Sequence, residues 1–338
     1  MNLTSIKILG IETSCDETAA AIVQDGKTIL SNIINSQISI HQQFGGVVPE
    51  VASRKHIENI AMVIDLAFKE ANLNYRDIDA IAVTNEPGLI GALLVGVSFA
   101  KAFAYALDKP LIAINHLQGH IYANFLENQD IAFPAVCLVV SGGHTSLIIM
   151  QDKTTYEMIG ATRDDAAGEA FDKVARFMGL GYPGGPAVQK AAELGQAGLV
   201  KLPRVFLDRG DFDFSFSGLK TATMNMWNKL SRRGEANVNH MAAEFQQALV
   251  EVLVEKTIRA AEKYRVKSVL LAGGVAANQK LRELMTIKAE ESNYDLYYPA
   301  LNLCTDNAAM IAGLAYHDYI NSSFAPLNLN AYSSLRSL

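Results

Sequence analysis

Two histidines, His116 and His120, stand four residues apart in the segment NHLQGH. At that spacing on a helix, side chains project from one face with Cβ atoms about 5–6 Å apart, so the two imidazoles can share one metal ion. A third ligand must come from elsewhere in the chain, and we expect Asp306 in CTDNAAM to supply it. The same residues also fit two hydrogen-bonded histidines with Asp306 as a helix N-cap. The spacing alone does not choose between these interpretations.

The histidine pair does not have the sequence of a metalloprotease site. HExxH proteases need a glutamate directly after the first histidine as general base, whereas Leu117 follows His116 here. A metal ion without an adjacent base is better suited to polarise or orient a substrate. A set of two histidines and one aspartate suits iron or zinc alike.

Two adjacent carboxylates, Asp16 and Glu17, stand in the polar turn of ILGIETSCDETAAAIV, residues 8–23. Carboxylates in such a turn can act as a general base, contact a metal or orient an amine. The alternative is ordinary turn chemistry, which aspartate favours. Cys15 has no histidine at a spacing that would support a nucleophile, so we expect a small turn or core thiol.

A second segment, CLVVSGGHTSLIIM at residues 137–150, has the same order of apolar strand, polar turn and apolar strand. Small turn residues leave backbone N–H groups free to bind phosphate oxygens. Gly-Gly pairs at 142–143, 184–185 and 273–274 indicate close approach of backbone to a nucleotide. Asp172 follows within a predicted helix, where it could accept ribose hydroxyls or pair with Arg176.

The elements that must position these residues repeat once along the chain. Residues 6–12, 19–24 and 28–34 form a predicted meander, followed by helix 49–71, strand 77–87 and helix 88–107. A second meander begins at residue 135, and helices at 165–178, 187–194 and 240–264 follow it. Two related halves of this kind predict a duplicated α/β fold with mixed sheets, facing each other across a nucleotide-sized cleft.

The length of 338 residues predicts about two domains. We place an N-terminal lobe at 1–128, joined by a C-terminal helical segment at 306–338, and a C-terminal lobe at 129–305. The second lobe carries a basic, irregular insert at about 200–235. This insert contains Lys201, Arg204, Arg209, Lys220, Lys229, Arg232 and Arg233.

The net charge of −6 means that the whole protein does not attract nucleic acid. Any RNA contact must therefore come from a local patch such as the basic insert, or from a partner protein. The alternative interpretation of the insert is an ordinary solvated surface.

Three cysteines without a CxxC motif predict neither a disulfide framework nor a zinc knuckle, which fits a reducing compartment. From the first residues of the sequence we expect no signal or transit peptide. The most apolar stretch, residues 87–100, is followed by Lys101 and is too short to span a bilayer, so we interpret it as a buried helix. We expect a cytoplasmic protein without membrane contact.

Ten motifs together resemble the universal tRNA threonylcarbamoyladenosine transferase family over nearly the whole chain. They are GIETSCDET, GGVVPEVASRKH, PGLIGALLVG, NHLQGH, LVVSGGHTSL, DDAAGEAFDKVAR, YPGGP, FSFSGLKT, LAGGVAAN and CTDNAAMIA. His144 after SGG, and Val139 where other branches carry tyrosine, resemble the bacterial and organellar branch. The resemblance implies the actin/Hsp70/sugar-kinase superfamily fold, with two RNase H-like lobes around a nucleotide cleft.

The resemblance also implies a reaction and its partners. Threonylcarbamoyl-AMP donates its threonylcarbamoyl group to the exocyclic amine of the adenosine 3′ of the anticodon, in tRNAs reading codons that start with A. The cofactor is one divalent metal ion, which we expect to be Fe²⁺, with Zn²⁺ as the alternative. The implied protein partners are a paralogous actin-like subunit and a small P-loop ATPase.

Residue roles carry over by motif. The implied metal ligands are His116, His120 and Asp306, and the implied activity-linked acids are Asp16 and Glu17. The implied donor-binding residues are Val139, Val140, Ser141, Gly142, Gly143, Asp172, Gly185 and Asn278. From the basic insert we expect Lys220, Arg232 and Arg233 to contact tRNA. Many relatives have a histidine where this chain has Asn115, which leaves the assigned ligands intact, whereas Val139 makes a tyrosine metal contact impossible.

Three rival functions remain open from the sequence. An ATP-dependent kinase or chaperone of the same fold would share the phosphate-binding turns but would not need the histidine pair. A metalloprotease is disfavoured by Leu117. A scaffold that binds nucleotide without catalysis would keep its biological output when His116 and His120 are replaced.

Overall fold

The computed structural model describes residues 5–205 and 210–334, and the chain divides into two compact units. Unit 1 comprises Met1–Gln129 and Pro299–Leu338, and unit 2 comprises Asp130–Tyr298. The chain thus returns to unit 1 at Pro299, whereas the sequence analysis placed this return at residue 306. The Ala300 backbone N–H donates to the Glu127 carboxylate at 2.7 Å, which ties this returning segment to unit 1.

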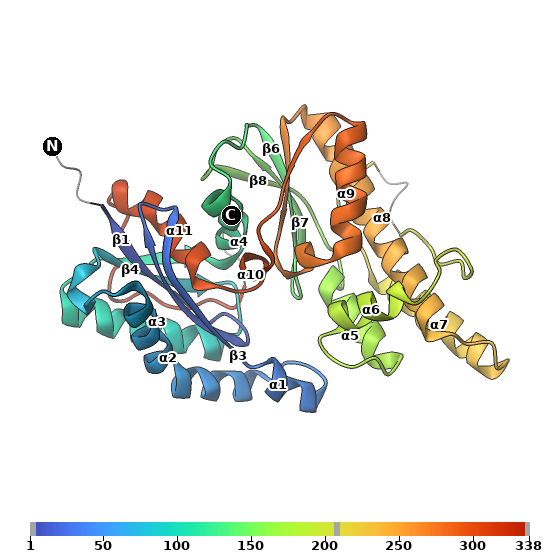
Figure 1. Cartoon of the computed structure of the whole chain (residues 1–338), viewed down its shortest axis with the longest axis horizontal. Helices are drawn as coiled ribbons and strands as arrows, with labels where there is room; N and C mark the ends of the chain where they lie inside the picture. The colour runs from blue at the N-terminus through green and yellow to red at the C-terminus, as the bar shows by residue number, and fades with distance from the viewer. Residues whose placement is uncertain (1–4, 206–209, 335–338) are drawn as a thin grey trace. The chain divides into compact units, whose positions relative to one another are not determined.

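Unit 1 is built on a five-stranded mixed sheet with the order β3-β2-β1-β4-β5. Its antiparallel part contains β1 (Lys7–Glu12), β2 (Glu17–Gln24) and β3 (Thr28–Ser36). Its parallel part adds β4 (Ala80–Glu86) and β5 (Leu111–Asn115) beside β1. The buried, largely apolar strands predict a sheet that is covered on both faces, and helices cover it (Figure 1).

Alternate residues of β1 show which helices cover which face. Leu9 and Ile11 lie in one apolar cluster with α2 (Pro49–Ala71) and α3 (Ile90–Leu107). Gly10 points the other way, toward α11 (Ala308–Ile320), because successive strand residues face opposite sides. A Cβ at Gly10 would lie 2.4 Å from a carbonyl oxygen of α11, so glycine is required for this close packing.

Unit 2 repeats this arrangement. Its five-stranded sheet has the order β10-β9-β6-β7-β8, which is that of unit 1 when β6 is matched to β1. β6 (Ala135–Val140), β7 (Thr145–Met150) and β8 (Tyr156–Ala161) are antiparallel, and β9 (Ser268–Ala272) and β10 (Asp295–Tyr297) complete the sheet in parallel. The predicted duplicated fold with mixed sheets is therefore confirmed.

The helices of unit 2 follow its strands in the chain. They are α5 (Ala167–Phe177), α6 (Gly184–Glu193), α7 (Ser217–Arg232), α8 (Val238–Tyr264) and α9 (Gln279–Glu291). Figure 1 labels them beside the sheet of this unit.

Unit 1 also contains α4 (His116–Glu127) and the short helices α1 (Ile38–His41) and α10 (Leu301–Cys304). The 3₁₀ turns are η1 (Gln42–Phe44), η2 (Tyr75–Asp77) and η3 (Gly274–Ala277).

The expectation of an irregular insert at 200–235 is wrong for its second half, which forms α7. The inner side of this helix carries Leu219 and Thr223, which are buried, while Arg232 and Arg233 at its end are exposed. The sequence analysis considered only the basic residues of this segment and overlooked the spacing of its apolar residues, which is typical of an amphipathic helix. Arg209 lies outside the described residues.

The apolar helix α3 runs from Ile90 to Leu107, which confirms the predicted helix at 88–107. It continues past Lys101, whose ammonium donates to the Leu329 carbonyl at 3.1 Å. By length and composition alone, α3 is the one helix among the described residues that could cross a membrane. Only one side of it is buried, and that side packs on β4 and α2.

Candidate functional site

The histidine pair of unit 1 is positioned by a strand-to-helix junction. β5 ends at Asn115, and α4 begins at His116. The Asn115 side chain caps the helix by accepting hydrogen bonds from the N–H groups of Leu117 and Gln118, at 2.9 and 3.3 Å. The first turn is therefore fixed, and the rings of His116 and His120 lie 4.5 Å apart between centroids.

Asp306 joins this pair from the segment before α11. Its Oδ1 atom lies 3.1 Å from His120 Nε2 and 3.6 Å from His116 Nε2. The alternative of Asp306 as helix cap is wrong, because the side chain of Asn307 occupies that position and accepts from the Met310 N–H. Sequence reasoning thus identified three residues that the fold brings together, although Asp306 lies 186 positions after His120.

The chemistry of this donor set fits a metal ion. The three candidate ligand atoms lie within 4.8 Å of one another, and both histidines are buried. Both imidazoles present Nε2 to the same carboxylate oxygen. Two neutral imidazoles and one carboxylate are an ordinary set for a divalent transition metal. The three residues can therefore hold a metal ion.

Glu12, which the sequence analysis did not single out, lies behind His116 and is fully buried at the end of β1. Its Oε1 accepts the Ser14 N–H at 2.5 Å, and its Oε2 accepts the Thr84 hydroxyl at 2.5 Å. Oε2 also lies 3.1 Å from His116 Nδ1. A glutamate that ends an otherwise apolar buried strand was the signal that could have revealed it.

The pKa values of Glu12 and His116 reflect this pairing. Burial opposes ionisation of Glu12, but the charge of His116 and the hydrogen bonds outweigh it and lower the pKa of Glu12. Burial likewise opposes protonation of His116, but Glu12 and Asp306 raise the pKa of His116 to about 9. The carboxylate is thus favoured in its ionised form, in which it can only accept hydrogen bonds.

The acidic turn contains Asp16, which is buried, and Glu17, which accepts the Ser36 hydroxyl at 3.0 Å. Burial, together with the charges of Asp306 and Asp16, raises the pKa of Glu17 to about 10. Burial and the same acids also raise the pKa of the Cys15 thiol. Cys15 is thus a poor nucleophile, whereas the carboxylates gather in a place where a cation would relieve their mutual repulsion.

His56, another residue that sequence reasoning missed, fixes the backbone of the acidic turn. Its Nε2 lies 2.9 Å from the Cys15 carbonyl oxygen, and its Nδ1 lies 2.8 Å from the Thr18 hydroxyl. Nε2–H must donate to the carbonyl, so Nδ1 accepts from Thr18. Burial lowers the pKa of His56, which favours this neutral form. The helix α2 thereby anchors the turn that carries both acids.

Seven glycines of unit 2, those of its three Gly-Gly pairs together with Gly168, fall into two groups. A Cβ would lie within 2.6 Å of backbone atoms in the first group, which comprises Gly168, Gly184 and Gly273. A Cβ would meet nothing within 4 Å in the second group, which comprises Gly142, Gly143, Gly185 and Gly274. The first group lets helices and strand ends pack closely, whereas the second leaves open space beside the backbone. Open space of this kind is what a ligand needs.

The predicted donor-binding residues lie in unit 2, several of them at the ends of its strands and helices. Ser141 forms a tight turn with His144 through N–H···O contacts of 2.8 and 3.1 Å. Asp172 Oδ1 accepts the Gly184 N–H at 2.7 Å and so joins α5 to the start of α6. The side chains of Val139 and Val140 are fully buried, which leaves only their backbone to contact a ligand.

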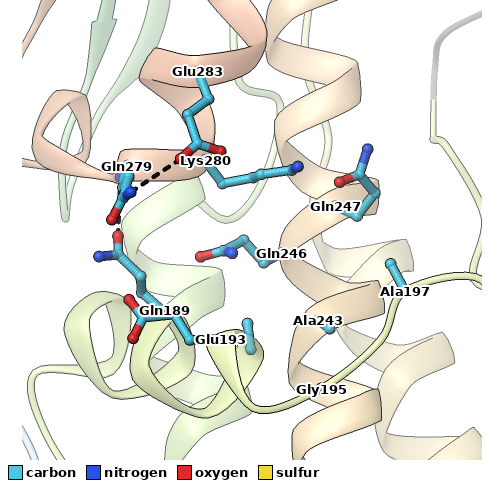
Figure 2. Close-up of a pocket in the computed structure, with 11 residues that line it drawn as sticks. Gln189, Glu193, Gly195, Ala197, Ala243, Gln246, Gln247, Gln279, Lys280 and Glu283 are labelled. Atoms are coloured by element: carbon cyan, nitrogen blue, oxygen red, sulfur yellow. Dashed lines mark hydrogen bonds between the residues drawn. The ribbon is translucent and has the colours of Figure 1, made fainter.

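A pocket of about 320 Å³ lies between α6, α8 and α9 in unit 2 (Figure 2). Its polar lining includes Gln189, Gln246, Gln279 and Lys280. Asn278, at the start of α9, donates to Gln246 at 2.9 Å, and the Gln279 N–H donates to Gln189 at 2.9 Å. This volume is at the small end of ligand pockets. Its lining supplies donors and acceptors that the sequence analysis, working from glycine turns, did not find.

The three basic residues expected to contact tRNA differ in their surroundings. Lys220 is half-buried and pairs with Asp165 at 2.5 Å, and Asp165 also binds Lys173 at 2.8 Å. Arg232 and Arg233 are exposed at the end of α7. The charge of Lys220 is therefore already engaged within the protein, while the two arginines face solvent.

Comparison with known proteins places this geometry in context. Residues 28–313 match the model of the family described as tRNA N6-adenosine threonylcarbamoyltransferase. The chain is 74% identical over 331 residues to the protein of that name from Syntrophomonas wolfei, covering 98% of each sequence. It is 55% identical over 333 residues to that from Moorella thermoacetica, covering 98% of this chain and 97% of the relative.

Solved structures share the fold at low sequence identity. One is component A of the (R)-2-hydroxyglutaryl-CoA dehydratase of Acidaminococcus fermentans, with a TM-score of 0.56, 15% identity, and coverage of 93% of this chain and 99% of that one. Another is full-length HypF in its phosphate- and nucleotide-bound form, with a TM-score of 0.61, 14% identity, and coverage of 95% and 56%. These likenesses bear on the fold, which is of the actin and sugar-kinase type.

Proposed function

The chain belongs to the tRNA N6-adenosine threonylcarbamoyltransferase family, and we propose that it uses threonylcarbamoyl-AMP as donor and the adenosine 3′ of the anticodon as acceptor. It is a transferase that modifies tRNA. The tRNAs we propose as substrates read codons that start with A. The observation that carries the proposal is the group of His116, His120 and Asp306, which a kinase or chaperone would not need.

We propose that this group is the metal site and that its ion is Fe²⁺. When bound, the ion would act as a Lewis acid on the carbamoyl carbonyl of the donor. The role of the protein is to present two Nε2 atoms and one carboxylate oxygen to a single point. The burial of both histidines excludes competing water from their ring faces.

The adenylate half of the donor is proposed to bind in unit 2. The backbone of Val139 to Gly143 would hold the phosphate, because turn N–H groups beside open glycines suit an anion. Asp172 and Gly185 would contact the ribose. Asn278 and the glutamine-lined pocket would receive the base, whose ring nitrogens and amine match amide side chains in hydrogen-bonding character.

The transfer step then needs a base for the attacking amine, and we propose Asp16 or Glu17; Glu17, whose pKa is raised to about 10, would serve when a bound cation relieves the repulsion among the acids. The N6 nitrogen of adenosine attacks the carbamoyl carbon, and the bond from that carbon to the phosphate oxygen breaks. AMP leaves with the bonding electron pair, and the proton lost by N6 passes to the carboxylate. Because the lone pair of an adenine amine is delocalised into its ring, orientation and deprotonation at this atom have a large effect on the rate.

The acceptor adenosine is stacked in the anticodon loop and must be turned outward to react. We propose that Lys220, Arg232 and Arg233 contact the tRNA backbone, the arginines from the exposed end of α7 and Lys220 from its start, where it pairs with Asp165. The overall charge of −6 requires such a local patch.

The proposed protein partners are a paralogous actin-like subunit and a small P-loop ATPase. Exposed apolar side chains of α2 and α3, including Ile57, Met62, Ile90 and Leu94, offer a docking surface for the paralogue. Apolar side chains gathered on adjacent helices are typical of protein interfaces. We propose a cytoplasmic location for the complex.

A pair of glycine substitutions tests donor binding in unit 2. Gly142→Ala adds a methyl group that meets no protein atom, so it is expected to leave the unfolding temperature unchanged and to weaken donor binding at least 10-fold, roughly 1.4 kcal/mol. Gly168→Ala places a Cβ 2.6 Å from the Ser141 carbonyl oxygen and should lower the free energy of unfolding by about 1–3 kcal/mol. Calorimetric titration with a non-hydrolysable donor analogue and thermal unfolding measure the two effects. Unchanged donor affinity in Gly142→Ala would contradict the proposed phosphate site.

Removal of the acids tests the base. We expect Asp16→Ala or Glu17→Ala to lower single-turnover transfer by about 10²–10⁴-fold while donor affinity is largely kept, since a base acts on the acceptor amine. Quenched-flow sampling of modified adenosine gives the rate, and the double variant serves as reference. Wild-type turnover in both single variants and in the double variant would remove both acids from the mechanism.

Neutralising the arginines tests the tRNA contact. Arg232→Gln/Arg233→Gln should weaken tRNA binding and flatten the plot of log affinity against log salt concentration, because fewer counterions are released. Lys201→Gln, an exposed lysine outside α7, is the matched control and should change the slope less. Filter binding across a salt series provides both values, and an unaltered slope in the double variant would place the tRNA contact elsewhere.

A further inference from the structure

We propose that Glu12 is a positioning residue that orients His116 and fixes the tautomer in which its Nε2 is free to bind metal. This role rests on the metal site proposed above and adds to it a buried residue, behind His116, that has no assigned role. It stands on three contacts of one buried carboxylate, which join β1, the loop after it, β4 and α4.

The hydrogen-bond donors around Glu12 determine what His116 can do. The Ser14 N–H can only donate, and the Thr84 hydroxyl donates to Oε2 at 2.5 Å. The contact at 3.1 Å between Oε2 and His116 Nδ1 then requires a proton on Nδ1, because an ionised carboxylate has none to give. In the neutral ring this leaves a lone pair on Nε2, the nitrogen that faces Asp306. A carboxylate behind a metal-binding histidine has this effect in general.

His120 provides the internal contrast. Its Nε2 faces the same aspartate oxygen at 3.1 Å, yet its Nδ1 is buried without a hydrogen-bond partner in the part of the chain that the structure describes. The protein therefore holds the tautomer of one histidine and leaves that of the other to be selected by the ion. The ring of His116 is therefore oriented before the metal binds, whereas the tautomer of His120 is set when the metal binds.

Glu12→Gln is the informative substitution because it preserves shape. Its carbonyl oxygen can still accept the Ser14 N–H, and the Thr84 hydroxyl can rotate to accept from the new amide. The amide then donates to His116 Nδ1 and moves the ring proton to Nε2, which blocks the metal-facing lone pair. We expect metal affinity to fall by about 10–100-fold, the usual effect of losing such an outer partner.

The measurement is a Co²⁺ titration of the purified full-length protein, followed by visible absorption and by chelator competition. Glu244→Gln is the matched control, since Glu244 is also a buried carboxylate that accepts two backbone N–H groups and an arginine, but lies in unit 2. It should affect stability without altering Co²⁺ affinity. Thermal unfolding of the metal-free proteins then separates folding from binding.

Three outcomes would overturn an element of the account. Wild-type Co²⁺ affinity in Glu12→Gln would refute the positioning role while leaving the metal site intact. An equal loss in Ser14→Ala, whose hydroxyl also lies 3.1 Å from His116 Nδ1, would assign the orienting role to Ser14 instead of Glu12. Failure of the wild type to bind Co²⁺ better than His116→Ala/His120→Ala would refute the metal site itself.

Discussion

The buried carboxylate of Glu12, at the end of β1, needs hydrogen-bond donors or a positive charge beside it to be stable. Several elements of unit 1 supply these partners. An isolated buried charge is very unfavourable, so Glu12 can exist there only with its donors in place. These donors come from the turn after β1, from β4 and from α4. The same contacts that satisfy the charge set the position of His116 relative to Asp306. The contacts that satisfy Glu12 within the folded sheet therefore also prepare the candidate metal site.

The turn that carries Asp16 and Glu17 is also held by a buried side chain. His56 on α2 contacts the Cys15 carbonyl oxygen and the Thr18 hydroxyl, which fixes the backbone on either side of Asp16 and Glu17. In unit 2, glycines that have no room for a Cβ allow close packing of backbone segments near the ends of β6 and β9. Other glycines there have open space beside them. The two units therefore share a topology but differ in their residues: unit 1 carries the candidate ligands and the acids, and unit 2 carries open glycines and a polar pocket.

Much of the fold could be predicted from the sequence. The spacing of apolar residues gave the bounds of α2, and the repeated meander predicted two related sheets. Of the site, the sequence predicted the candidate metal ligands but not the residues behind them that orient His116. Asp306 was identified by its place before a helix, whereas Glu12 and Thr84 gave no spacing signal, because β1 and β4 become neighbours only in the folded sheet. The helix α7 was missed because the segment was interpreted from its charged residues, whereas a few buried side chains, Leu219 and Thr223, determine its packing.

The central claim is that the histidine–aspartate group acts in threonylcarbamoyl transfer to tRNA. The most direct test is a single-turnover assay with protein of measured metal content, synthetic threonylcarbamoyl-AMP, the proposed partner proteins and an unmodified tRNA that reads a codon starting with A. The account predicts modified adenosine and one equivalent of AMP from the wild type, and no product from His116→Ala/His120→Ala. Product formed by that variant at the wild-type rate, or donor bound but unconsumed by the wild type, would contradict it.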